Sequence, residues 1–390
     1  MSLVAPLGAA PNEGAALAVR VSRLEMTAPG RIAISIEISG FEPNLHPTIE
    51  SAIRIGGQVI EGPQQMAVAG HLPVLLDLPA GTARLGGVEI FHFTPVPPFD
   101  RNTPVAIVVT VRQANDVATA SQVGVLLLPT VVVPGYLNDL GAQPDDGVMS
   151  VLERRGYRVV GGAPTLFWFT YASRRANVEA AARALTVYLR GTVLPSVYAA
   201  RLNVIGYSEG GLLARWNLAF DPDWAHLVRS FVMVGVPNQG AVGSYLYGWY
   251  PALASFAATP AARDMLPAYP YWRPDDQTQW TVPPDGRNAT LERLNARALP
   301  EDVQVYAFYG SSARLTTWSG LTGALPDVTY SYGPGDGIVL AASVLGLPIN
   351  GGGGIPGFPE RIYHVDLGPV GHLSLLRAAI PKIADVLTER

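Results

Sequence analysis

A serine between two glycines is the residue of this chain best placed for covalent chemistry. Gly206, Ser208 and Gly210 form the pattern Gly-x-Ser-x-Gly. The largely apolar segment 201–206 before it predicts a strand, and residues 212–220 after it predict a helix. A sharp turn between a strand and a helix holds such a serine in a strained backbone conformation, with its hydroxyl exposed. This context indicates that Ser208 is a nucleophile; the alternative is a glycine-rich turn with an ordinary capping serine.

A serine hydroxyl needs a histidine as base and a carboxylate that orients the histidine. When the serine lies on a strand–turn–helix elbow, the acid follows it in the chain and the histidine comes last. Of the three histidines after Ser208, His372 lies in a loop between the last predicted strand and the final predicted helix. We therefore predict that His372 is the base. His226 comes directly after the helix of the nucleophile, and His364 lies within the last strand, where a structural role is expected.

Asp336 is the predicted acid. It has glycine on both sides, which allows a tight turn that brings a carboxylate inward. It also lies between Ser208 and His372 in the chain, as the order requires. Asp327, in the same loop, and Asp366, near the end of the last strand, remain alternatives.

Backbone N–H groups are expected to stabilise the oxyanion that forms during attack by serine. One should belong to Glu209, the residue after the nucleophile. The other should belong to Tyr136, in the loop after the apolar strand 131–133, where Gly135 lets the chain turn. The Glu209 side chain is expected to be incidental or to act electrostatically. The Tyr136 side chain either lines an acyl pocket or is simply packed.

Composition excludes several other kinds of chemistry. The 390 residues are 48% hydrophobic and 15% charged, which is enough apolar material for a large core. The net charge of −4 is spread along the chain and gives no footprint for nucleic acid. Cysteine is absent, which rules out disulfides and thiolate chemistry. The histidines lack the spacing of metal ligands, so neither a metal nor another cofactor is expected.

Residues 1–122 are predicted to form an all-β domain. Apolar and polar residues alternate along 32–38 and 105–111, the pattern of strands with one buried face. Shorter strands are predicted at 17–24, 52–55, 74–78 and 88–93. Several short strands without helices favour a small sandwich of the immunoglobulin-like kind, although the cysteine pair of that fold is missing.

Residues 123–390 are predicted to form a mostly parallel sheet covered by helices, because strand and helix patterns alternate. Strands are predicted at 131–133, 157–160, 166–170, 201–206, 230–236, 303–309 and 361–367, and helices at 148–155, 174–190 and 373–387. The apolar run 123–133 is too short to span a membrane and is interpreted as buried strands. Residues 241–300 interrupt the alternation with many aromatic residues and prolines, which predicts a cap or lid.

Four segments carry a resemblance to a known family. Pro134-Gly135-Tyr136 is similar to its His-Gly-x oxyanion segment, with proline in place of histidine. Residues 235–241, Gly-Val-Pro-Asn-Gln-Gly-Ala, are similar to its Gly-Thr-Pro-His/Asn-x-Gly-Ser stretch, and 262–267 and 291–295 look like its cap segments. Together with Asp336-Gly337 and Gly371-His372, they make residues from about 125 onward resemble bacterial lipases and esterases of the α/β-hydrolase superfamily. The cap pattern is more distantly similar to lecithin:cholesterol acyltransferases and inositol deacylases.

The resemblance implies an α/β-hydrolase domain over residues 123–390, with a cap insertion at about 241–300. It also implies hydrolysis of hydrophobic carboxylic esters through an acyl-enzyme, with a small-molecule or lipid ester as substrate and transient contact with a lipid interface. The same triad would serve an acyltransferase, an amidase or a thioesterase. A different alternative is a protein that binds a surface or polymer and carries an inactive hydrolase scaffold. The oligomeric state is left open.

The location of the protein is predicted from weak features. Residues 1–6 lack the basic and long apolar regions of a signal peptide. The absence of cysteine is compatible with secretion by a bacterium. We expect a secreted or extracytoplasmic protein, with a cytoplasmic one as the alternative.

Overall fold

Two kinds of β-sheet organise the chain, and each belongs to a different unit. The computed structural model describes residues 16–28, 31–39, 48–56, 58–67, 82–92, 99–136, 146–159, 164–173, 175–197, 199–241, 259–269, 271–273, 276–281, 288–311, 333–349 and 351–388. The first unit consists mainly of Met1–Leu127, and the second of Leu128–Val159 and Pro164–Glu389.

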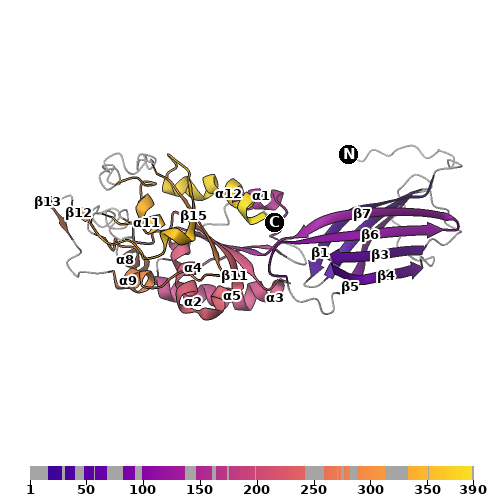
Figure 1. Ribbon diagram of the computed structural model, residues 1–390, viewed down its shortest axis with the longest axis horizontal. Helices are drawn as coiled ribbons and strands as arrows, with labels where there is room; N and C mark the ends of the chain where they lie inside the picture. Colours follow the sequence, from indigo (N-terminus) through magenta and orange to yellow (C-terminus); the bar gives the residue numbers. More distant parts are fainter. Residues whose placement is uncertain are drawn as a thin grey trace. The chain divides into compact units, whose positions relative to one another are not determined.

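The first unit contains two antiparallel sheets (Figure 1). One has the strand order β1-β2-β5 and the other β4-β3-β6-β7. The strands are β1 (Ala18–Ala28), β2 (Arg31–Ser39), β3 (Thr48–Ile55), β4 (Gln58–Ala67), β5 (Thr82–His92), β6 (Thr103–Gln113) and β7 (Asp116–Leu126). In immunoglobulin constant-type sandwiches the fourth strand shares a sheet with the first two, whereas here it pairs with the third. The immunoglobulin-like assignment therefore stays a prediction, and the strand predicted at 74–78 lies outside the described residues.

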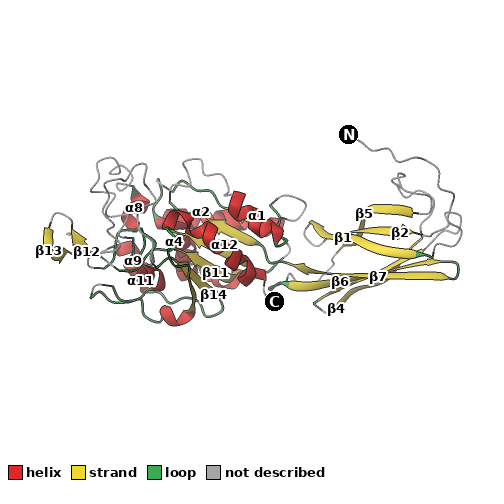
Figure 2. Cartoon of the chain, turned by 90° about the horizontal axis from the view of Figure 1, so that it is seen from above, coloured by secondary structure: helices red, strands yellow, loops and turns green. Residues whose placement is uncertain are grey.

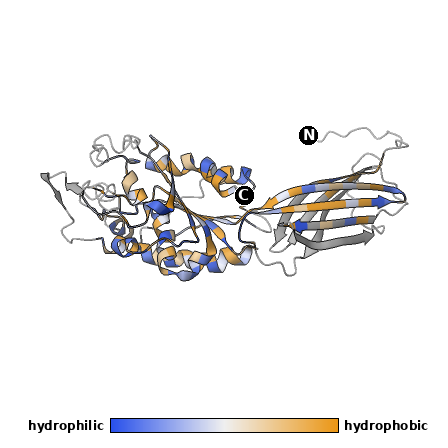
Figure 3. Ribbon diagram, viewed as in Figure 1, coloured by the Kyte–Doolittle hydropathy of each residue, from blue (hydrophilic) through white to orange (hydrophobic). Residues whose placement is uncertain are grey.

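Alternating burial along β6 explains how the two sheets meet. Figure 3 shows hydrophobic and hydrophilic residues alternating on β6 and β7. The inward residues of β6 are buried and pack with Val21, Ile36 and Ile38 from the other sheet. Because each strand turns every second side chain to the same face, this pattern produces a sandwich with one shared core.

The second unit is built on a parallel sheet of six strands in the order β15-β14-β11-β10-β8-β9. Every neighbouring pair in it is parallel, as the sequence predicts. Its strands are β8 (Thr130–Val133), β9 (Leu166–Trp168), β10 (Leu202–Tyr207), β11 (Val228–Val234), β14 (Gln304–Tyr309) and β15 (Ile362–Asp366). The central strands β8, β10 and β11 are almost entirely buried, which matches their continuous apolar sequences.

Helices cover both faces of this sheet (Figure 1). On one face lie α2 (Val178–Tyr188), α4 (Glu209–Phe220) and α5 (Pro222–Leu227), and on the other α1 (Asp146–Arg154) and α12 (His372–Thr388). Figure 2 shows the same helices in red, alongside the yellow strands. This is the layered arrangement expected when parallel strands are joined by helical crossovers. None of the helices in the described ranges is long and apolar enough to span a membrane.

Three predicted elements differ from the structure in their extent. The apolar run 123–133 contains the end of β7 and all of β8, so the first unit extends past residue 122. The strand predicted at 157–160 is wrong for residues 157–159, which form a loop after α1 in which Tyr157 is buried. The helix predicted from 174 begins at Val178, because the Asn177 side chain accepts a hydrogen bond from Ala180 N and caps it.

The segment predicted as a cap is only partly described. It contains α8 (Pro260–Asp264), the hairpin of β12 (Tyr271–Arg273) and β13 (Asp276–Thr281), and α9 (Ala289–Asn295). Asp264 joins these helices to the body of the unit: its Oδ2 accepts from Val178 N at 2.8 Å and its Oδ1 from the Thr290 hydroxyl at 2.8 Å. The aromatic residues between 245 and 250 lie outside the described residues. The function of this segment as a lid stays a prediction.

Candidate active site

Ser208 stands at the sharp turn between β10 and α4. Its backbone has φ 52° and ψ −125°, a conformation that L-residues seldom adopt. Such a conformation costs on the order of 1–3 kcal/mol and persists only where the surrounding structure holds it. Here Ser208 N donates to Val234 O in the neighbouring strand β11 at 2.9 Å. The turn predicted from the sequence is therefore present, with the expected strain at the serine.

The two glycines of the pattern let strand and helix approach closely. A Cβ atom at Gly206 would lie 2.4 Å from the Cα of Gly211, and one at Gly210 would lie 2.2 Å from the carbonyl oxygen of Val133. Side chains do not fit at such distances from backbone atoms. The need for glycine at both positions thus follows from the packing of α4 against β10 and β8.

His372 and Asp336 complete a hydrogen-bonded chain with Ser208. His372 Nε2 lies 2.9 Å from Ser208 Oγ, and His372 Nδ1 lies 2.6 Å from Asp336 Oδ2. The exposed fractions are 8% for Ser208, 6% for His372 and 2% for Asp336. The structure thus brings together the three residues predicted from the sequence, in an environment that is largely shielded from water.

The Asp336 carboxylate is oriented by its own turn. Its Oδ1 accepts hydrogen bonds from Ile338 N at 3.0 Å and Val339 N at 2.8 Å. This leaves Oδ2 directed at His372, whose own backbone N donates to the Asp336 carbonyl oxygen at 2.9 Å. Three hydrogen bonds from backbone N–H groups and one side-chain contact therefore fix the acid against the imidazole.

Tyr207 also supports His372, a contact that sequence reasoning missed. The Tyr207 hydroxyl donates to the His372 carbonyl oxygen at 2.7 Å, and the two rings stack with centroids 5.3 Å apart. Its place directly before Ser208 was the available signal, since that position lies at the end of the strand that carries the nucleophile.

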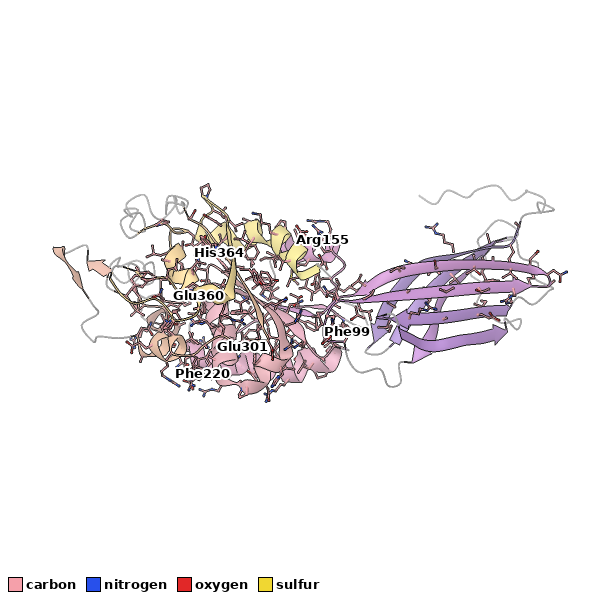
Figure 4. The ribbon with its side chains drawn as sticks, viewed as in Figure 1. Phe99, Arg155, Phe220, Glu301, Glu360 and His364 are labelled. Carbon is pink, nitrogen blue, oxygen red and sulfur yellow. The ribbon has the colours of Figure 1, made fainter. Side chains whose placement is uncertain are left out.

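The alternative histidines and carboxylates lie elsewhere in the second unit. His226, on α5, is exposed, and so is His364, which Figure 4 labels on β15. The centroid of the His364 ring lies 6.3 Å from that of the Tyr309 ring. The Asp366 carboxylate accepts a hydrogen bond from Gly368 N. Burial raises the pKa of Tyr309, and the negative charge of Asp366 raises it further. Asp327 lies outside the described residues.

The predicted oxyanion segment passes directly beside the serine. A Cβ atom on Gly135 would lie 2.9 Å from the Cβ of Ser208, so the backbone there is in contact with the nucleophile. The Tyr136 side chain extends to the cap segment, where its hydroxyl lies 2.8 Å from Thr259 Oγ1. Glu209 is the first residue of α4, and N–H groups in the first turn of a helix have no acceptor within the helix.

The Glu209 side chain has a more definite environment than the sequence indicates. It is fully buried, and the Tyr171 hydroxyl lies 3.0 Å from its Oε2. The same hydroxyl lies 3.1 Å from the Pro134 carbonyl oxygen, in the oxyanion segment. Sequence reasoning missed Tyr171 because nothing in the residues around 171 indicates a contact with residues 134 and 209.

A second buried polar side chain lies on α4, the helix that follows Ser208. Arg215 on α4 is 1% exposed, and burial lowers the pKa of its guanidinium to about 9. Its Nη1 donates to Asn238 Oδ1 at 3.2 Å, and the guanidinium lies 4.4 Å from the centre of the Phe358 ring. Asn238 Nδ2 in turn donates to Val344 O at 2.6 Å. These contacts join α4 to α11 (Ala341–Leu345), the helix that follows the Asp336 turn.

The chemistry available to this arrangement is nucleophilic. A histidine nitrogen within hydrogen-bond distance of a serine hydroxyl can accept its proton, and a carboxylate on the opposite ring nitrogen stabilises the imidazolium that forms. In the described ranges, no group of three or more histidine, aspartate or glutamate side chains is arranged to hold a metal ion.

No protein-family model matches the chain, and no curated protein matches it. Solved structures similar to it include the mature lipase BlEst2 from Bacillus licheniformis, with a TM-score of 0.47 and 14% identity over 67% of this chain and 93% of that one. Another is the phospholipase PlaB from Legionella pneumophila in complex with thio-NAD, with a TM-score of 0.41 and 14% identity over 56% of this chain and 44% of that one. A third is the metagenomic carboxyl esterase MGS0156, with a TM-score of 0.40 and 18% identity over 67% of this chain and 75% of that one.

The order of the chain through the second unit identifies its fold. A parallel sheet carries a serine elbow after β10, an acid after β14 and a histidine after β15. This combination of parallel strands, elbow and loop order is the arrangement of the α/β-hydrolase superfamily. The second unit therefore has the α/β-hydrolase fold.

Proposed function

We propose that the protein is a serine hydrolase that cleaves carboxylic esters through an acyl-enzyme. The observation that carries the proposal is the buried chain of hydrogen bonds from Ser208 Oγ through His372 to Asp336. Isolated serines and histidines are common in proteins, but this order of contacts at a strained elbow is the geometry of an activated nucleophile.

The proposed reaction begins with transfer of the Ser208 proton to His372 Nε2 as Oγ attacks the ester carbonyl carbon. Asp336 holds the imidazole in the tautomer with hydrogen on Nδ1 and stabilises the imidazolium. The amides of Glu209 and Tyr136 are the proposed donors to the oxyanion. His372 then gives its proton to the leaving alcohol, an acyl-enzyme remains on Ser208, and a water molecule repeats the cycle to release the acid.

A hydrophobic acyl group is the proposed substrate class. The segment 241–300 is rich in tyrosine and tryptophan, whose large apolar surfaces suit such groups. The hydroxyl contact between Tyr136 and Thr259 links the oxyanion segment to this region, which supports a role for it as a lid.

The proposal is tested by comparing hydrolysis of p-nitrophenyl esters, from acetyl to palmitoyl, by the wild type and Ser208→Ala. We expect Ser208→Ala to lose activity by at least about 10⁴-fold, because no other group replaces the nucleophile. Ser150→Ala is the matched control, since that hydroxyl donates to the Gly147 carbonyl oxygen within α1 and its loss should leave turnover unchanged. Equal activity of Ser208→Ala and the wild type would contradict the proposal.

A further inference from the structure

One tyrosine hydroxyl contacts both segments that carry the proposed oxyanion donors, one at a backbone oxygen and the other at a side-chain oxygen. The Tyr171 hydroxyl lies 3.1 Å from the carbonyl oxygen of Pro134, which is two residues before Tyr136. It also lies 3.0 Å from Oε2 of Glu209, the residue whose amide is the other proposed donor. Residues from three separate parts of the chain thus meet at a single oxygen atom.

The surroundings of this hydroxyl leave it little freedom to move. Glu209 is fully buried and Tyr171 nearly so. The Tyr171 ring is stacked on Phe169, with centroids 5.4 Å apart and an angle of 8° between the planes. Rotating the hydroxyl away would therefore require a rearrangement of packed rings rather than a simple side-chain rotation.

The contact with Pro134 bears on the direction of the next amide groups. A peptide unit is planar, so a carbonyl oxygen held in place also fixes the plane that leads into Gly135. That plane lies against α4: a Cβ on Gly210 would lie 2.4 Å from the same Pro134 oxygen. Gly135 in turn contacts the Ser208 side chain. The orientation of the Pro134 peptide therefore fixes the position of the Gly135 Cα atom, from which the backbone continues to the Tyr136 amide.

We infer that Tyr171 is a positioning residue for the oxyanion site, holding the oxyanion segment at a fixed distance from the start of α4. This inference rests on the proposed function. Hydrogen bonds to an oxyanion strengthen only in the transition state, so a displaced donor lowers kcat more than it raises KM. A tyrosine that served packing alone would change stability and leave kcat as it is.

The test removes the hydroxyl and keeps the ring. In Tyr171→Phe we expect kcat for a p-nitrophenyl ester to fall by about tenfold to a hundredfold, with KM within about twofold of the wild type. Tyr188→Phe is the matched control, because the Tyr188 ring also contacts the Phe169 ring and the Tyr188 hydroxyl donates to Trp168 O at 3.4 Å. Its kcat should equal that of the wild type.

A second variant keeps the test decisive if Tyr171→Phe fails to fold. Glu209→Ala removes the acceptor but keeps the backbone amide, and its kcat should fall as in Tyr171→Phe. Wild-type kcat in Glu209→Ala, or in a folded Tyr171→Phe, would overturn the inference.

Labelling with a fluorophosphonate separates this inference from the proposed function. Covalent labelling of the wild type and none of Ser208→Ala supports the nucleophile, and slower labelling of Tyr171→Phe then supports the positioning role. Labelling of Tyr171→Phe at the wild-type rate, with unchanged kcat, overturns the positioning role alone. A wild type that neither labels nor hydrolyses esters overturns the proposed function and, with it, this inference.

Discussion

At the scale of single residues, the site depends on side chains whose orientation is fixed by more than one contact. Asp336 offers one carboxylate oxygen to two backbone amides and the other to His372, so its orientation is set before any substrate binds. His372 is held by Asp336 through its ring and by Tyr207 through its carbonyl oxygen. Preorganisation of this kind reduces the motion that the reaction itself would otherwise require.

We expect Asp336→Asn to lower kcat by about 10³–10⁴-fold, because an amide can favour the wrong imidazole tautomer and cannot stabilise the imidazolium. Its side-chain oxygen can still accept from Ile338 and Val339, so the melting temperature should change little. Steady-state kinetics and thermal unfolding of the same preparation check both statements. Asp366→Asn is the control, since that side chain is exposed; loss of activity in this variant, with Asp336→Asn active, would exchange the roles of the two residues.

At the scale of secondary-structure elements, the loop after β11 ties the helix of the nucleophile to the helix behind the acid. Asn238 accepts from Arg215 on α4 and donates to Val344 O on α11. Gln239 adds two further contacts, from its backbone N to Ser343 Oγ and from its Nε2 to Leu347 O. All of these contacts except the one to Leu347 O are buried, and a missing partner costs more in a buried position than at the surface.

Asn238→Ala is expected to lower the free energy of unfolding by about 2–4 kcal/mol. Arg215 would lose its side-chain acceptor, and the Val344 carbonyl oxygen would lose its donor, each in a buried environment. Urea denaturation measures the effect.

Arg190→Ala is the control: its ion pairs with Asp221 and Asp223 are exposed, so the free energy of unfolding should change by less than about 1 kcal/mol. A smaller effect of Asn238→Ala than of Arg190→Ala would contradict the structural role of the loop.

At the scale of the whole molecule, the two units have separate hydrophobic cores. Within the described ranges, the core of the first unit contains residues from Val21 to Val111, and that of the second contains residues from Val131 to Ile362. The three residues of the hydrogen-bonded chain at Ser208 all belong to the second unit. Stability and activity should therefore be separable by substitutions in one core or the other.

Ile107→Ala tests this separation, because Ile107 is fully buried in the first core. We expect calorimetry to show one transition lowered by about 2–5 kcal/mol in stability, while ester hydrolysis at 25 °C keeps its wild-type rate. Leu185→Ala in the second core should instead lower the temperature at which activity is lost. If Ile107→Ala lowered the thermal inactivation temperature as much as Leu185→Ala does, the two cores would form a single cooperative unit.

The amino-acid sequence by itself determined the local features of the site. Residues 201–220 specify strand, elbow and helix because hydrophobic periodicity and glycine placement act over a few residues. The order of Ser208, Asp336 and His372 also follows from the sequence, since the alternation of strands and helices fixes at which loops they occur. Residues 157–159 form a loop although a strand is predicted there, because a run this short is too brief for its pattern to distinguish a strand from a loop.

Only the tertiary structure decided which of these residues meet. His372 approaches Asp336 from 36 positions away in the chain and Ser208 from 164, and no local pattern encodes distances across such separations. The same holds for Tyr171, which lies 37 residues from Pro134 and 38 from Glu209. Polar groups such as Tyr171, Glu209 and Arg215 find their partners through the way strands and helices pack. The physical reason is that hydrogen bonds require directions and distances that only a complete fold can fix.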